Sequence, residues 1–136
     1  EKVGQHSLTA GDHGTTYGGN PLACAAVAKV LELFEENNIL EHVREVSAYL
    51  EEKLDSLAAK YDFITDRRGM GLMQGLVFDR PVAPVINAAL ENGLILINAG
   101  INIIRFVPPL VITDADVDEM IEILDSCLKT FQEQNA

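Results

Sequence analysis

The sequence predicts an α+β domain in two layers, with helices packed on one face of a small, mostly antiparallel sheet. Two segments with helical periodicity come first, strand-like segments follow from residue 63 to residue 107, and a further helical stripe closes the chain. The composition fits this class. A chain of 136 residues with 48% hydrophobic and 23% charged residues suits one globular domain with its own core.

The net charge of −11 argues against two classes of partner. Nucleic acids and anionic membrane surfaces both need clustered cations. No apolar run is long enough to span a membrane, and residues 1–20 lack the apolar stretch of a signal peptide. The first residue, Glu1, indicates a fragment or a processed chain, since a natural start would be Met.

Cys24 and Cys127 both lie in apolar helical patterns. This predicts buried, reduced thiols in a cytoplasmic protein. No metal site is expected, because the histidines have no ligand-like spacing with either cysteine.

The first elements are a loop and two helices. Residues 4–20 are rich in Gly and Thr without periodicity, which is typical of a loop. Asn20-Pro21 is a good helix start, and the helix should end near Asn37-Asn38. Its apolar stripe is Leu22, Ala23, Ala26, Val27, Val30, Leu31 and Phe34. The second helix carries Val43, Val46, Leu50, Leu54 and Leu57, opposite a solvated face of Glu41, Arg44, Glu45, Glu51, Glu52 and Lys53.

The middle of the chain alternates short strands and turns. We expect a strand at Phe63–Thr65, a break at Arg67–Gly71, and a second strand at Leu72–Phe78. Gly75, inside that strand, indicates a bulge or a close approach of another segment. After a turn at residues 79–81, a short helix should cover Pro84–Glu91, with Asn92-Gly93 closing it.

The final elements are two strands and a helix. Leu94–Ile97 and Ile103–Val107 read as strands joined by a turn at residues 99–102, with Pro108-Pro109 ending the second. Thr113 and Asp116 resemble a capping box. The helical stripe that follows is Val117, Met120, Ile121, Leu124, Leu128 and Phe131.

Residues 14–21, Gly-Thr-Thr-Tyr-Gly-Gly-Asn-Pro, form the first candidate site. Glycines expose backbone N–H groups, Thr15 and Thr16 add hydroxyl donors, and the helix start adds unpaired N–H groups. Together these suit a phosphate. The alternative is an ordinary Gly-rich loop before a capped helix, since the segment matches no standard nucleotide fingerprint.

Arg105 is the second candidate, because it places a cation in a strand whose two faces are otherwise apolar. A guanidinium there needs a partner, and it can grip a carboxylate through two parallel hydrogen bonds. That partner could be a ligand or a structural Asp or Glu. An exposed edge position is the third possibility.

A third segment, Arg67–Met73, reads mainly as a turn on a crowded backbone path. No nucleophile or general base accompanies these candidates. A Ser-His-Asp signature is absent. Lys29, Lys53, Lys60 and Lys129 lie on polar helix faces, and Lys2 lies at the start of the chain, so none has the apolar setting of a Schiff-base lysine. The residues alone indicate part of a binding site for a phosphorylated and a carboxylated ligand.

Three blocks in order resemble the C-terminal part of the class-III, ornithine-type, pyridoxal-phosphate aminotransferases. Gly11–Ala23 is similar to the family segment Gly-His-Gly-Ser-Thr-aromatic-Gly-Gly-Asn-Pro. Arg68–Met73 is similar to its Arg-Gly-x-Gly-Leu-Met turn, and Asn102–Leu110 to its Asn-x-Ile-Arg-Phe-x-Pro-Pro-Leu strand. The resemblance covers essentially the whole chain.

The resemblance implies a role for each block. Thr16, with Thr15 as a helper, would reach the phosphate of pyridoxal 5'-phosphate bound in a neighbouring subunit of a homodimer. Arg105 would grip the α-carboxylate of amino-acid and 2-oxo-acid substrates such as glutamate and 2-oxoglutarate, while Arg68 would be structural. Residues 1–20 would end the large cofactor domain, and residues 21–136 would form the C-terminal small domain of a fold-type I transferase. The Schiff-base lysine would lie upstream, so the isolated chain should be inactive. The competing hypothesis is a free-standing, non-catalytic binding or interaction module.

Overall fold

The structure, a computed structural model, describes residue 9 and residues 11–134. Backbone contacts divide the chain into two compact units, with the boundary after Asn38. In the part of the chain that is described, none of the helices has the length and apolar character needed to cross a membrane.

The described part of the first unit is a loop followed by helix α2, Pro21–Glu36. Asn20 caps the helix as expected, because its side-chain oxygen accepts a hydrogen bond from the backbone N–H of Ala23 at 3.0 Å. The helix ends at Asn37, and Asn38 takes a left-handed conformation with φ of 53°. Asn tolerates that conformation better than most residues, so both predicted ends are confirmed.

None of the residues of α2 is buried, and its apolar stripe is mostly exposed, with only Ala23 and Phe34 half-buried within the described residues. Leu22 is 81% exposed and Leu31 is 62% exposed. Cys24 is exposed as well, so the prediction that both thiols are buried is wrong for Cys24 and right for Cys127. The physical reason is that periodicity identifies the apolar face of a helix but not the surface that covers it.

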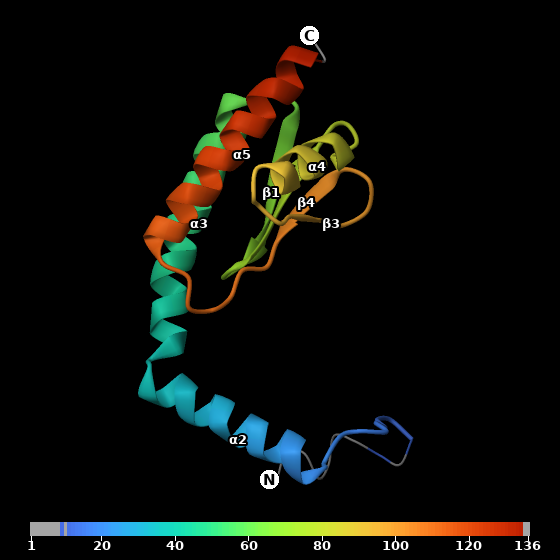
Figure 1. The fold of residues 1–136 in the computed structure, drawn as a ribbon, viewed down its shortest axis with the longest axis vertical. Coiled ribbons are helices and arrows are strands. Elements are labelled where there is room, and N and C mark those ends of the chain that lie inside the picture. The colour runs from blue at the N-terminus through green and yellow to red at the C-terminus, as the bar shows by residue number, and fades with distance from the viewer. Residues whose placement is uncertain (1–8, 10, 135–136) are drawn as a thin grey trace. The chain divides into compact units, whose positions relative to one another are not determined.

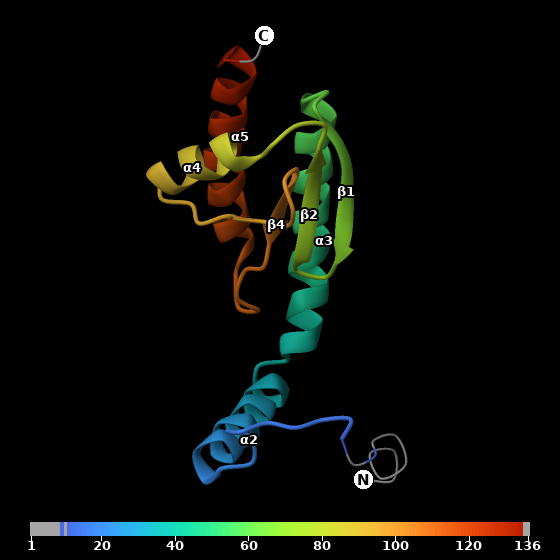
Figure 2. The same cartoon turned by 90° about the vertical axis from the view of Figure 1, so that its right-hand side faces the viewer.

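The second unit contains an antiparallel sheet in the order β1-β2-β4-β3 and three helices (Figures 1 and 2). The elements in chain order are α3 (Ile39–Lys60), β1 (Ile64–Met70), β2 (Met73–Phe78), α4 (Ala83–Glu91), β3 (Ile97–Asn98), β4 (Ile103–Phe106) and α5 (Asp114–Gln134). The predicted α+β class is confirmed.

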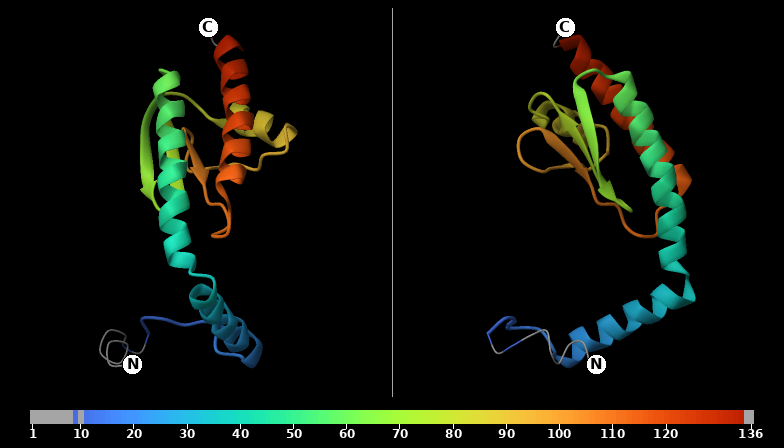
Figure 3. Two further views of the ribbon diagram at one scale, coloured as in Figure 1. Left: turned by 90° about the vertical axis from the view of Figure 1, so that its left-hand side faces the viewer. Right: turned by 180° about the vertical axis from the view of Figure 1, so that it is seen from behind.

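The core lies between the sheet and helices α3 and α5, which run side by side (Figure 3). Helix α3 packs on β1 and β2, while α4 packs on α5 and against β3. The inner face of the sheet contributes Leu76, Ile104 and Phe106, all buried. Antiparallel pairing places directly opposed residues on the same face. The face with Leu76 is therefore the inner face, and the face with Arg105 is the outer face.

The first strand is longer than the sequence predicts. The expected break at Arg67–Gly71 is wrong, because residues 67–70 pair with β2, and only Gly71 and Leu72 form the turn of a tight hairpin. Gly69 explains how the strand continues. Its φ is +143°, and a Cβ there would collide with the carbonyl oxygen of Met73. The crowded backbone path expected at these glycines is confirmed.

Two further strand predictions need correction. A bulge at Gly75 is wrong, because the register shift lies between Ile64 and Asp66 in β1. The alternative for Gly75, a close approach of another segment, is confirmed, because a Cβ there would come within 3.3 Å of Ile103 Cγ2. Leu94–Ile97 is not a full strand, because only Ile97-Asn98 pairs. The N–H of Leu94 instead bonds to the carbonyl of Ala89 at 2.8 Å, which closes α4.

The start of the last helix is confirmed. The N–H and hydroxyl of Thr113 donate to Asp116 Oδ2 at 2.7 and 2.8 Å, and the Asp116 N–H approaches the Thr113 hydroxyl at 3.4 Å. These hydrogen bonds, the first of them from the Thr113 N–H, hold the pKa of Asp116 below its usual value.

Candidate functional site

The Gly-rich loop presents Thr16 to solvent. The Thr16 side chain makes no hydrogen bond to any described residue, so its hydroxyl is open to a ligand. The neighbouring Thr15 is exposed too, but its hydroxyl oxygen accepts a hydrogen bond from Gly18 N at 3.1 Å. The two hydroxyls therefore differ: that of Thr15 shapes the turn, and that of Thr16 is unused within the described residues.

At the start of α2, the side-chain groups of Asn20 are already in use within the chain. The Asn20 amide group also donates to the carbonyl of Tyr17, so one side chain joins the loop to the helix. Because Asn20 caps the Ala23 N–H, part of the positive end of the helix is already neutralised. The loop is thus an ordered turn with free hydroxyl donors, which suits a contributor to a phosphate site.

Arg105 lies on β4, an interior strand of the sheet, with its side chain on the outer face. The residue is exposed, and its guanidinium has no hydrogen bond or ion pair with any described residue. Of the three possibilities for this residue, a structural ion pair is therefore wrong within the described chain. An edge position is wrong as well. That Arg105 holds a ligand carboxylate stays a prediction.

Arg105 belongs to a row of directly paired residues across the sheet. Arg68 on β1 pairs with Gly75 on β2, and Gly75 pairs with Arg105 on β4. The two arginines therefore share the outer face, separated by a glycine that adds no side chain. Arg68 is already engaged, since its Nε donates to Asp66 at 2.9 Å. That hydrogen bond keeps the pKa of Asp66 below its usual value.

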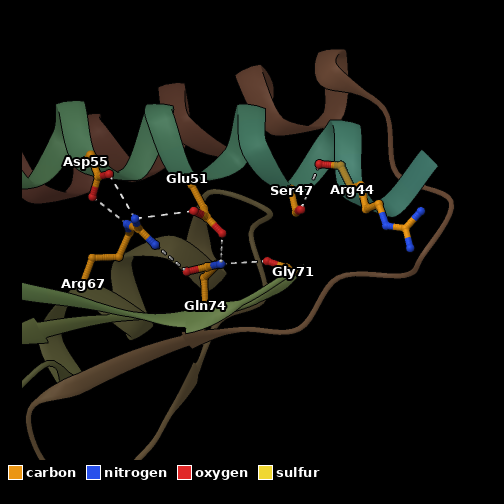
Figure 4. A network of polar contacts seen from close by, with 7 residues as sticks. All are labelled: Arg44, Ser47, Glu51, Asp55, Arg67, Gly71 and Gln74. Carbon is orange, nitrogen blue, oxygen red and sulfur yellow. Dashed lines mark hydrogen bonds and ion pairs between the residues drawn. The ribbon is translucent and has the colours of Figure 1, made fainter. Parts of the chain in front are cut away.

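The inner face carries a polar network that the sequence analysis missed (Figure 4). Gln74 is only 1% exposed. Its Nε2 donates to Glu51 Oε1 at 3.0 Å and to the carbonyl of Gly71 at 2.7 Å, while its Oε1 accepts from Arg67 Nη1 at 3.0 Å. Every polar atom of this buried amide has a partner, as burial requires.

Arg67 joins the same network to helix α3. Its Nε and Nη2 donate to the two oxygens of Asp55 at 2.5 and 3.0 Å, a two-pronged pair that raises the pKa of Arg67. Nη2 also lies 3.6 Å from Glu51 Oε2. The network ties the β1–β2 hairpin to α3, and it explains why adjacent arginines on one strand have opposite roles: Arg67 faces inward and Arg68 outward. The sequence did contain a signal for this network. Gln74 alternates with Leu76 and Phe78, so it is a polar residue at a strand position that faces the core.

Three of the described lysines, Lys29, Lys53 and Lys60, form ion pairs with carboxylates. Lys53 pairs with Asp118 at 2.6 Å and Lys60 with Asp125 at 2.5 Å. The hydrogen bond that Lys53 donates to Asp118 raises the pKa of Lys53, which is the opposite of what a Schiff-base lysine needs. Lys29 lies 3.0 Å from Glu32, and Lys2 lies outside the described residues.

The two candidate sites belong to different compact units: Thr15 and Thr16 to the first, and Arg105 to the second. Within the described residues, no group of three or more His, Cys, Asp and Glu side chains gathers as a metal site. The structure therefore presents a hydroxyl-rich loop in one unit and an unpaired guanidinium in the other.

A search of protein families matches residues 1–128 to the family described as aminotransferase class-III. Among curated proteins, the acetylornithine aminotransferase of Clostridium acetobutylicum is 44% identical over 124 residues, which are 90% of this chain and 32% of that protein. The mitochondrial acetylornithine aminotransferase of Saccharomyces cerevisiae is 42% identical over 130 residues, or 95% of this chain and 30% of that protein. The chain thus spans about a third of the length of these relatives.

The chain is also similar to solved structures of aminotransferases. An acetylornithine aminotransferase from Elizabethkingia anophelis superposes with a TM-score of 0.77 at 31% identity, covering 88% of this chain and 31% of that one. An ornithine aminotransferase from Plasmodium yoelii superposes with a TM-score of 0.80, also at 31% identity, covering 91% of this chain and 34% of that one.

Proposed function

This chain belongs to the class-III aminotransferase family, and we propose that it is the C-terminal part of an acetylornithine aminotransferase. The parent would transfer the amino group of N-acetylornithine to 2-oxoglutarate, giving N-acetylglutamate semialdehyde and glutamate in arginine biosynthesis. The observation that carries the proposal is Arg105. A guanidinium without a partner among the described residues, on an interior strand of a family member, is fitted to hold a substrate carboxylate.

Arg105 would bind and orient the α-carboxylate through two parallel hydrogen bonds. Its strand is fixed by pairing with β2 on one side and β3 on the other, so the backbone that carries it is held in place. Gly75, which pairs with Arg105 on β2, adds no side chain of its own between Arg105 and Arg68. Orientation of this kind lowers the entropy cost of the reaction.

Thr16 would donate its hydroxyl to the phosphate of pyridoxal 5'-phosphate, with Thr15 as a helper. The free Thr16 hydroxyl and the adjacent glycines fit such a phosphate contact. When bound, pyridoxal phosphate supplies the electron sink for amino-group transfer. In this proposal the cofactor belongs to the neighbouring subunit of a homodimer, residues 1–20 end the large cofactor domain, and residues 21–136 form the small domain.

Other parts of the proposal concern the whole protein. The Schiff-base lysine would lie upstream of this chain, which alone would have no activity. The exposed stripe of α2 supports a further covering surface in the parent. We place the parent in the cytoplasm, without a nucleic-acid or membrane partner, in line with the net charge of −11.

The test is Arg105→Ala in the full-length parent. Loss of a charged, two-pronged contact should raise KM for 2-oxoglutarate by about 100-fold, while pyridoxal-phosphate affinity changes less than about twofold. An equal loss of both affinities would assign Arg105 a structural role and contradict the proposal. The matched control is Arg44→Ala, which removes an exposed arginine that pairs with Glu41.

The amino donor is tested separately. N-acetylornithine, ornithine and 4-aminobutyrate should be compared as donors for the parent, with N-acetylornithine giving the highest kcat/KM. The ornithine aminotransferase structure matched above is the specific observation that favours ornithine as the second candidate. A non-catalytic module is the remaining alternative. A borohydride-trapped cofactor on a lysine of the isolated chain would contradict the idea that the reacting lysine lies upstream.

A further inference from the structure

The end of helix α4 carries the only Asn-Gly pair in the sequence, Asn92-Gly93. Both residues are exposed, and a Cβ added at Gly93 would meet nothing within 4 Å. Gly93 has a φ of +86°, the left-handed conformation that commonly ends a helix. The turn therefore places an accessible side-chain amide directly before a backbone nitrogen that no side chain shields.

An asparagine in this setting can react with its own backbone. The nitrogen of Gly93 attacks Cγ of Asn92, and its proton passes by way of solvent to the leaving nitrogen. The Cγ–Nδ2 bond breaks, ammonia leaves, and a five-membered succinimide ring remains. Water then adds to one of the two ring carbonyls and opens the ring, which leaves an aspartyl or isoaspartyl residue. The net change is the exchange of NH₂ for OH, with water as the only co-reactant.

Hydrogen bonds restrain this reaction in the folded chain. Asn92 Nδ2 donates to the carbonyl of Ala88 at 2.8 Å, which holds the side chain that would be attacked. The N–H of Gly93 donates to the carbonyl of Leu90 at 3.1 Å, which holds the attacking nitrogen. Ring closure must break both contacts. The reaction therefore proceeds from molecules in which the end of α4 has opened.

We propose that Asn92 is a spontaneous deamidation site, controlled by opening of the end of α4, and that its product loosens α4 from α5 and uncovers Cys127. The product places a carboxylate where Nδ2 donated to the Ala88 carbonyl, so an attraction becomes a repulsion. Negative charge is also unfavourable at the C-terminal end of a helix. Asn92 Nδ2 lies 4.0 Å from Cys127 Sγ, so the change occurs directly beside this thiol.

Cys127 reports whether α4 stays in place. The thiol is buried on α5, against which α4 packs. Burial raises the pKa of the Cys127 thiol, so the reactive thiolate is scarce while the residue is covered. Cys24 is exposed and serves as the internal reference. Asn92 and Cys127 both lie in the second unit, so the inference is independent of the proposed aminotransferase function.

The first experiment follows ammonia loss at each asparagine by peptide mass spectrometry, after incubation of the chain at mildly alkaline pH with and without urea. In urea, Asn92 should react about tenfold faster than Asn87, which is followed by Ala88 and its Cβ. Without urea, Asn92 should react about tenfold more slowly than in urea, because two hydrogen bonds must break. Equal rates at Asn87 and Asn92 would overturn the site. Equal rates with and without urea would overturn its control by α4.

A substitution at the second residue of the pair tests the attacking nitrogen. Gly93→Asn keeps a residue that tolerates the left-handed conformation and adds a Cβ into open space. In urea it should slow the reaction of Asn92 about fivefold, because the Cβ hinders the approach of the nitrogen. An unchanged rate would show that the reaction does not pass through the Gly93 nitrogen.

The structural consequence is tested with Asn92→Asp, which imitates one product. A thiol reagent should label Cys127 about fivefold faster than in the wild type, with Cys24 unchanged. Asn87→Asp is the matched control, because it adds the same charge in the middle of the same helix. Wild-type chain aged until Asn92 has reacted should behave like Asn92→Asp. An unchanged labelling rate of Cys127 in the aged chain, or equal labelling of both thiols in a chain that has lost its fold, would overturn the proposed local loosening.

Discussion

The two faces of the sheet use arginine in opposite ways. On the inner face, Arg67 gives hydrogen bonds to Asp55 and Gln74, within a network that joins the hairpin to α3. On the outer face, Arg105 gives none to any described residue. An arginine satisfied internally contributes to stability, whereas one left unpaired can contribute to binding. The difference predicts which substitutions change folding and which change function.

The largest effect on stability should come from Gly69→Ala. The new methyl group would collide with the Met73 carbonyl and approach Gln74 Oε1 at 2.7 Å, in a backbone conformation that alanine rarely adopts. The free energy of unfolding should fall by about 3 kcal/mol or more, measured by urea denaturation. Gly71→Ala is the control. It also has positive φ, but its nearest neighbour is 3.8 Å away, so it should cost only about 1 kcal/mol. Equal costs would show that steric contact at Gly69 is unimportant.

The next effect should come from Gln74→Leu. Leucine has a similar size but removes the amide donor that the Gly71 carbonyl and Glu51 Oε1 share. The expected loss is about 2 kcal/mol of unfolding free energy. Met73→Leu, at the exposed neighbouring position, should change it by less than about 0.5 kcal/mol. If Gln74→Leu left the free energy of unfolding unchanged, the polar network would contribute no more to stability than an apolar core does.

The comparison between the faces is tested most directly by the two arginines themselves. Arg67→Met should lower the unfolding free energy by about 1–2 kcal/mol, because it leaves Asp55 and Gln74 without their donor. Arg105→Met should change it by less than about 0.5 kcal/mol, because the guanidinium has no described partner to lose. A double-mutant cycle of Arg67 and Gln74 should show coupling, and one of Arg105 and Gln74 should not. The reverse result would contradict the division of roles.

The sequence predicted those features of the fold that depend on residues close together in the chain. The Asn20 cap, the Thr113–Asp116 pair and the end of α4 at Asn92-Gly93 are local patterns, and all were predicted. Arg67–Met70 was misjudged because its pairing with β2 and its hydrogen bonds to α3 are tertiary, and these outweigh the turn preference of the glycines.

The candidate site shows the same limit. The strand pattern marked Arg105 as unusual, but only the structure distinguishes a paired from an unpaired guanidinium.

The smallest expected effect is a pH dependence of the free energy of unfolding that arises at the start of α5. The hydrogen bonds from Thr113 lower the pKa of Asp116 in the folded state, with the backbone N–H first among the causes. A carboxylate with a lowered folded pKa stabilises the fold above its unfolded pKa of about 3.9, and this contribution is lost as the pH falls through the folded pKa.

Asp116→Asn should therefore be less stable than the wild type at pH 6, and the difference in unfolding free energy between the two should narrow towards pH 3. Urea midpoints measured at several pH values check this, with Thr113→Val giving an intermediate slope because it keeps the backbone donor and loses the hydroxyl. A gap that widens on acidification would show that the cap does not stabilise the ionised carboxylate.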